Sequence, residues 1–110
     1  MRYLMLVCTD PSAEPYDPAQ DNIEAWVSEM DAKGIRILGD RLAGASQART
    51  IQKRKGSVVV TDGPFVETSE VIGGFDVLDC ASLAEAVEVA AKHPMARFGS
   101  LELRPFWSSE

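Results

Sequence analysis

The segment from Tyr3 to Cys8 constrains the fold most, because all six of its residues are hydrophobic. Successive side chains of a strand point to opposite faces of its sheet, so such a strand has to be covered on both faces. The rest of the chain supplies only two helical patterns, which are enough for one face of a sheet. The sequence therefore predicts that a second copy of the chain covers the other face, giving a homodimer through the sheet faces.

Length and charge exclude several classes of protein. The 110 residues fit one domain, and 45% hydrophobic with 25% charged residues is typical of a globular chain. Eleven Lys and Arg residues against seventeen Asp and Glu residues leave a net charge of −6, which disfavours nucleic acid and anionic membranes as partners. The first hydrophobic run is too short for a signal peptide or a membrane span, so we expect a cytoplasmic protein.

Two segments have the periodicity of amphipathic helices. The first is predicted over residues 18–33, with Asp17 as its N-cap. The second is predicted to follow Ser82, whose spacing to Glu85 matches a capping box, and to end at His93. The hydrophobic stripe of the first helix is Ile23, Trp26, Val27 and Met30, and that of the second is Leu83, Ala86, Val87 and Ala90.

The remaining hydrophobic segments have the patterns of β-strands. Their order along the chain predicts an α+β domain, a ferredoxin-like βαββαβ unit with an added hairpin and an antiparallel sheet that carries two helices on one face. A glycine at position 39 suggests a bulge in the second strand. The predicted strands after the first are residues 35–42, 70–80 and 98–104, and the predicted hairpin pairs residues 50–53 with residues 57–61 across Arg54-Lys55-Gly56.

Residues 61–68, Thr-Asp-Gly-Pro-Phe-Val-Glu-Thr, resemble the signature of the DGPF group of YCII-related proteins. The resemblance spans nearly the whole chain as a single domain, residues 1–110, and implies the dimeric α+β barrel fold, in which two ferredoxin-like subunits pack sheet against sheet. Most members have no assigned reaction, and some are encoded beside or fused to sigma-factor proteins, which makes a protein of a sigma-factor system a candidate partner. Further matches are Met1–Leu6, Gly73-Gly74-Phe75, Asp79–Ala86, His93-Pro94 and Arg97–Pro105.

The YCII branch is proposed to use a histidine on the first helix together with an aspartate near the following strand. When the helix end is aligned on Ala32-Lys33-Gly34, Ile23 stands near the histidine position and Ile35 or Arg36 stands near the aspartate position. Residues 18–34 contain no histidine, so this dyad does not carry over to the present chain.

Asp62 has two interpretations. In the structural one, its carboxylate accepts backbone N–H bonds in the turn formed with Gly63-Pro64. In the functional one, Asp62 lies at the mouth of a pocket, and partial desolvation raises its pKa to a value useful for a general base. Glu67 is then a candidate second carboxylate.

The other polar candidates also have two interpretations each. His93, the only histidine, is expected to act as a cation at the carboxyl end of the second helix or to bind a ligand. Arg97 is expected to pair at the dimer interface or to line a pocket. The basic segment from Arg49 to Lys55 is either a solvated edge or a site for an anion or a partner. One histidine and two distant cysteines, Cys8 and Cys80, argue against a structural metal site, and no cofactor is implied.

These residues support two hypotheses about function. The first is a small-ligand-binding homodimer, extended by a weak general acid–base activity of Asp62, with a pocket between the sheet and the helices. The second is a noncatalytic regulatory or protein-interaction module that binds a partner such as a sigma-factor system. An enclosed cavity with convergent polar groups favours the first, and a filled core with an exposed hydrophobic patch favours the second. The candidate ligand-binding residues are Asp62, Phe65, Glu67, Arg97 and His93.

Overall fold

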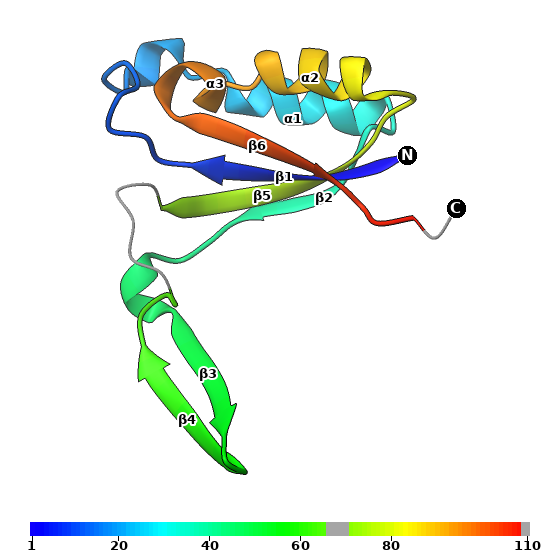
Figure 1. Ribbon diagram of the computed structural model, residues 1–110. Helices are drawn as coiled ribbons and strands as arrows, with labels where there is room; N and C mark the ends of the chain where they lie inside the picture. The colour runs from blue at the N-terminus through cyan, green and yellow to red at the C-terminus, as the bar shows by residue number, and fades with distance from the viewer. Residues whose placement is uncertain (66–70, 109–110) are drawn as a thin grey trace.

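The computed structural model describes residues 1–65 and 71–108 as a four-stranded antiparallel sheet with helices on one face, and a separate two-stranded hairpin (Figure 1). The sheet order β2-β5-β1-β6 confirms the predicted ferredoxin-like α+β fold with an added hairpin. Among the described residues, no helix is long and hydrophobic enough to span a membrane. The elements are β1 (Arg2–Cys8), η1 (Pro18–Gln20), α1 (Ile23–Ala32), β2 (Arg36–Arg41), η2 (Ala45–Gln47), β3 (Arg49–Arg54), β4 (Ser57–Asp62), β5 (Ile72–Asp79), α2 (Leu83–Ala91), α3 (Met95–Phe98) and β6 (Ser100–Pro105).

The hydrophobic core lies between the sheet and the helices. Tyr3 and Met5 of β1 face the helices and are 2% and 0% exposed. The indole Nε1 of Trp26 in α1 donates a hydrogen bond of 2.9 Å to the backbone oxygen of Val89 in α2, which ties the two helices together. This face of the sheet is therefore sealed by the chain's own helices. The buried cluster consists of Tyr3, Met5, Trp26, Met30, Leu78, Cys80, Ala86, Val89 and Ala90.

The opposite face of the sheet is uncovered in a single chain. Helices α1, α2 and α3 all lie on one side of the sheet in Figure 1. The cross-strand register pairs β1 with β5 and β5 with β2, and directly opposed residues of antiparallel strands share a face. On the face away from the helices, Leu38 is 51% exposed and the other hydrophobic side chains are partly exposed. We call this surface the open face; its hydrophobic residues are Leu4, Leu6, Leu38, Phe75 and Val77.

Helix α1 begins at Ile23, and the predicted start at Pro18 is wrong. Asp17 caps the short η1 turn instead, because its carboxylate accepts a hydrogen bond of 3.0 Å from the backbone nitrogen of Ala19. Asp21 then takes up extended backbone, and its carboxylate accepts a 3.0 Å hydrogen bond from the nitrogen of Ile23. Extended backbone at Asp21, followed by Asn22 as the N-cap of α1, thus interrupts the segment that was predicted as one helix.

α2 starts where predicted, after Ser82, and ends at Ala91, two residues before the predicted end, but its buried stripe differs from the prediction. Val89 is buried, whereas Leu83 and Val87 are 56% and 52% exposed. The helix packs through Ala86, Val89 and Ala90, whose i, i+3, i+4 spacing defines a neighbouring stripe on the same helix. Leu83 and Val87 consequently lie on the surface.

The short helix α3 was not predicted, and β6 begins at Ser100 rather than at Phe98. Gly99 joins these two elements in a tight space. A Cβ atom at Gly99 would lie 2.4 Å from the backbone oxygen of Cys8 and 2.7 Å from the Cε atom of Met95. The end of α3 therefore approaches β1 so closely that position 99 requires glycine.

We expect Gly99→Ala to lower the free energy of unfolding by about 1–3 kcal/mol, because backbone or side chain has to move to admit the methyl group. Gly44→Ala is the matched control, since no atom lies within 4 Å of a Cβ at Gly44 and its φ of −58° suits alanine. Urea titration of both variants measures the difference. Equal stability of the two variants would contradict the packing described for Gly99.

Candidate functional site

The structure does not bring the predicted site residues together in one chain. Asp62 ends β4, and Phe65 follows it at the base of the hairpin, which lies below the sheet in Figure 1. His93 and Arg97 belong to the α2–α3 region above the sheet. Glu67 lies outside the described residues. The sheet thus separates the candidates into two groups.

Asp62 and Phe65 form the group at the base of the hairpin. The Asp62 carboxylate pairs with Arg49, with 3.1 Å between Oδ1 and Nε, and the Asp62 side chain is 85% exposed. Phe65 is 75% exposed. The carboxylate is therefore available to a molecule that approaches the hairpin from solvent.

Arg97 holds the loop after β1 against α3. Its Nε lies 3.1 Å from Oε2 of Glu14, and its guanidinium lies 5.0 Å from the centre of the Phe98 ring. Tyr16 contacts the same ring edge to face, at 5.4 Å between ring centres. These contacts give Arg97 a positioning role on the helix side of the sheet.

His93 is buried and neutral, and the predicted cation at the end of α2 is wrong. Its ring lies 4.7 Å from the Trp26 ring, edge to face, and its Nδ1 accepts a 3.0 Å hydrogen bond from the backbone nitrogen of Met95. Burial lowers the pKa of His93 to about 4, against a smaller opposing effect of Asp21. The imidazole therefore serves as a hydrogen-bond acceptor that starts α3.

Arg36 and Asp76 form a partly buried ion pair that the sequence patterns did not predict. Arg36 Nε lies 2.8 Å from Oδ1 of Asp76, and the two side chains are 18% and 9% exposed. Arg36 also pairs with Asp31 at 3.2 Å and donates to the backbone oxygen of Gly39 at 2.9 Å. Burial raises the pKa of Asp76 despite the opposing effect of Arg36, whose own pKa is raised by the hydrogen bond to Asp76.

One sequence signal could have revealed this pair. A Cβ atom at Gly39 would lie 2.1 Å from Oδ1 of Asp76, so the glycine makes room for the carboxylate. The irregular register of β2 falls between Arg36 and Leu38, which places the suspected bulge just before Gly39 rather than at it. An aspartate at an inward position of a hydrophobic strand, opposite a glycine in the next strand, is the pattern to look for.

Two shallow depressions lie on the surface, each with a volume of about 480 Å³, and neither is lined by a predicted site residue. The first surrounds the start of α1. The second lies between α2 and the edge strand β6, and most of the side chains that line it are hydrophobic. The first is lined by Tyr16, Pro18, Asp21, Asn22, Ile23, Glu24 and Ala25, and the second by Leu83, Val87, Ala90, Ala91, Ala96, Gly99, Ser100, Leu101 and Leu103.

Comparison with known proteins identifies the family. Residues 1–109 match the model of the YCII-related domain. The chain belongs to the YCII-related family. It is 43% identical to an uncharacterised protein of Rhizobium meliloti (strain 1021), in a match that covers 74% of this chain and 79% of that protein.

A solved structure supports the fold of this YCII-related domain. The 5-chloro-2-hydroxyhydroquinone dehydrochlorinase of Burkholderia phenoliruptrix AC1100, in complex with 2,5-dihydroxybenzoquinone, superposes with a TM-score of 0.52 at 16% identity. The match covers 98% of this chain and 94% of the dehydrochlorinase. At this identity the likeness concerns the fold alone.

This YCII-related domain departs from the dyad that the family resemblance implies. Ile23 begins α1 and Arg36 begins β2, close to the positions expected for a histidine and an aspartate. The carboxylate beside Arg36 comes from Asp76 on the neighbouring strand, and the imidazole beside α1 comes from His93 after α2. Both groups are engaged in structural contacts.

We expect the YCII-related domain to lose stability as the pH falls from about 6.5 to about 4, because His93 stays neutral in the folded protein while it gains a proton in the unfolded chain. The loss attributable to His93 is about 3 kcal/mol. His93→Asn keeps an oxygen that can accept from Met95 but does not titrate. Urea titrations between pH 5 and pH 7 should show a smaller pH slope for the variant, and equal slopes would contradict a buried neutral His93.

Proposed function

We propose that this protein is a cytoplasmic, small-ligand-binding homodimer in which two chains pack with their open faces together. The open face carries this proposal, because helices α1, α2 and α3 lie on the other side of the sheet and leave the hydrophobic residues of this face partly exposed. Charged residues surround that centre, as in a protein interface with a hydrophobic core and a polar rim. A two-fold axis lets the same surface serve on both chains. The rim includes Asp40 of β2 and Glu102 and Arg104 of β6, which the register places beside Phe75, Leu6 and Leu4.

The hydrophobic core fills the space between the sheet and the helices, where the pocket was predicted. In this proposal the ligand chamber forms instead at the base of the hairpin when the second chain packs. Asp62 supplies a carboxylate for acid–base work and Phe65 a hydrophobic wall, with Glu67 as a further candidate close in sequence. His93 and Arg97 lie on the helix side and take no part in this chamber. The proposal is supported by the related fold of a dehydrochlorinase that binds a small dihydroxyquinone.

A noncatalytic interaction module is the second candidate. A filled core and an exposed hydrophobic face, which were expected to favour such a module, are both present, and the hydrophobic depression beside β6 adds to them. Leu83 and Val87 of α2 and Leu101 and Leu103 of β6 line this depression. β6 pairs only with β1 among the described strands, so its outer edge is open to an added strand. An extended segment of a partner, such as a protein of a sigma-factor system, can bind in this way.

We expect 2,5-dihydroxybenzoquinone at about ten times its dissociation constant to stabilise the protein by about 1.4 kcal/mol, which corresponds to a rise of several degrees in melting temperature. Asp62→Asn should abolish most of this shift and leave the melting temperature without ligand nearly unchanged, since the Asp62–Arg49 pair is exposed. Differential scanning fluorimetry measures both effects.

Glu88→Gln is the control for this experiment, because it removes an exposed carboxylate from α2 on the helix side. It should retain the full shift. Intact mass spectrometry has to show that the quinone forms no covalent adduct with Cys8 or Cys80. If Asp62→Asn and Glu88→Gln respond alike, Asp62 is not part of the ligand site, and the absence of any shift with this probe contradicts a site for small dihydroxyquinones.

A further inference from the structure

The hairpin formed by β3 and β4 lacks support from the rest of its own chain. It projects from the sheet in Figure 1 and forms a sheet of its own. Its contacts with the other described elements are slight. A two-stranded hairpin by itself is only marginally stable in water. This hairpin therefore needs a second surface to hold it.

One side of the hairpin is a hydrophobic surface. The register places Ile51 opposite Val60 and Lys53 opposite Val58, so these four side chains lie on the same side. Ile51, Val58 and Val60 are 64%, 63% and 59% exposed. Adjacent hydrophobic side chains with this exposure mark an interaction surface.

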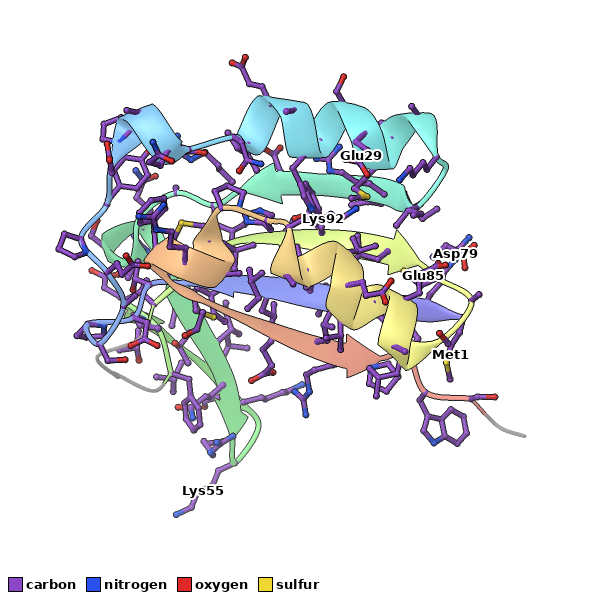
Figure 2. The ribbon with its side chains drawn as sticks, turned by 90° about the horizontal axis from the view of Figure 1, so that it is seen from above. Met1, Glu29, Lys55, Asp79, Glu85 and Lys92 are labelled. Carbon is purple, nitrogen blue, oxygen red and sulfur yellow. The ribbon has the colours of Figure 1, made fainter. Side chains whose placement is uncertain are left out.

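The charge of the hairpin identifies the kind of surface that it fits. Residues 49–62 contain four of the eleven basic residues and one of the seventeen acidic residues, so the hairpin carries +3 and the rest of the chain carries −9. Lys55 extends from the tip, well away from the sheet (Figure 2). A second copy of this chain offers an acidic body to such a basic arm, and attraction between the two favours their encounter.

The direction of the hairpin agrees with a second copy as the occupant. It leaves the body on the side opposite the helices, which is the side of the open face (Figure 1). A chain packed against the open face therefore lies within its reach. We infer that the β3–β4 hairpin is an arm that packs its Ile51–Val58–Val60 side and its basic tip against the acidic body of the second chain. This inference rests on the proposed homodimer and adds a second contact to it, so that each chain gives one arm and receives one.

A cross-linking experiment tests where the arm lies. A photoreactive benzophenone amino acid replaces Val58 on the arm or, as a matched control, Val87, an exposed valine on α2. Mixed dimers of ¹⁴N and ¹⁵N protein then distinguish cross-links between chains from cross-links within a chain. Position 58 should cross-link a light chain to a heavy chain, and position 87 should not. Cross-links from position 58 only within one chain, or none at all, would overturn the inference.

Charge reversal tests the electrostatic part. Lys53→Glu with Lys55→Glu should raise the dimer dissociation constant about tenfold or more at low salt, and the difference should largely vanish at about 1 M NaCl. Lys33→Glu with Lys92→Glu makes the same change of charge on the helix layer, where both lysines contact Glu29, and should not weaken dimerisation, because it leaves the arm basic and the body acidic. Sedimentation velocity measures the dissociation constants.

The possible outcomes separate the arm from the dimer. A dimer whose dissociation constant is equal in both double variants contradicts the basic arm but leaves the open-face contact standing. A wild-type chain that stays monomeric contradicts the proposed homodimer and the arm together. A wild-type monomer that acquires a partner of a different kind through the arm also overturns the inference, because the occupant is then not a second copy.

Discussion

The structure depends on a mismatch between a sheet with two hydrophobic faces and a helix layer that covers one of them. In β1, Tyr3 and Met5 point into the core, while Leu4 and Leu6 point away from it. The period of a strand makes this division unavoidable once six hydrophobic residues follow one another. The α1–α2 contact, fixed by the hydrogen bond from Trp26 to Val89, closes one side, and the other side is left for a different molecule.

The polar groups on the closed side are satisfied without a ligand. Asp76 is paired with Arg36, and the His93 Nδ1 accepts a backbone hydrogen bond. Among the described residues, no buried side-chain nitrogen or oxygen lacks a hydrogen-bond partner. A buried binding site offers a ligand polar groups that have no partner within the protein, and the helix side of the sheet offers none among the described residues. The helix side therefore serves as a scaffold. Asp62 and Phe65, which are exposed on the other side, are the better candidates for binding.

Hydrophobic periodicity and turn residues predicted the fold well. The site was harder to predict, because it depends on contacts between residues that are far apart in the sequence. The turn of the hairpin follows from Lys55 and Gly56, whose positive φ values of 50° and 80° suit a two-residue turn. The late start of α1 depended on the short turn capped by Asp17 and on the extended backbone at Asp21, which periodicity does not reveal. The protonation state of His93 depended on burial against Trp26, a residue 67 positions away in the chain.

The pairing of Arg36 with Asp76 shows the same limit. The two residues are 40 positions apart and meet only because β2 and β5 are neighbours in the sheet. The separation of Asp62 from Arg97 has a similar origin, since the hairpin leaves the sheet on the side opposite α3. Local patterns define the elements, but the sheet order decides which of their polar residues meet.

Sedimentation equilibrium at about 10 µM tests the central claim most directly, because it reports whether a second chain covers the open face. One chain has a mass of 12.0 kDa, and the account predicts twice that mass for the wild type. Leu6→Glu, which puts a charge in the centre of the open face, should give the mass of one chain, whereas Val87→Glu on α2 should still give the mass of two. A folded wild-type chain that sediments as a single chain, or a Leu6→Glu variant that dimerises as strongly as the wild type, would contradict the account.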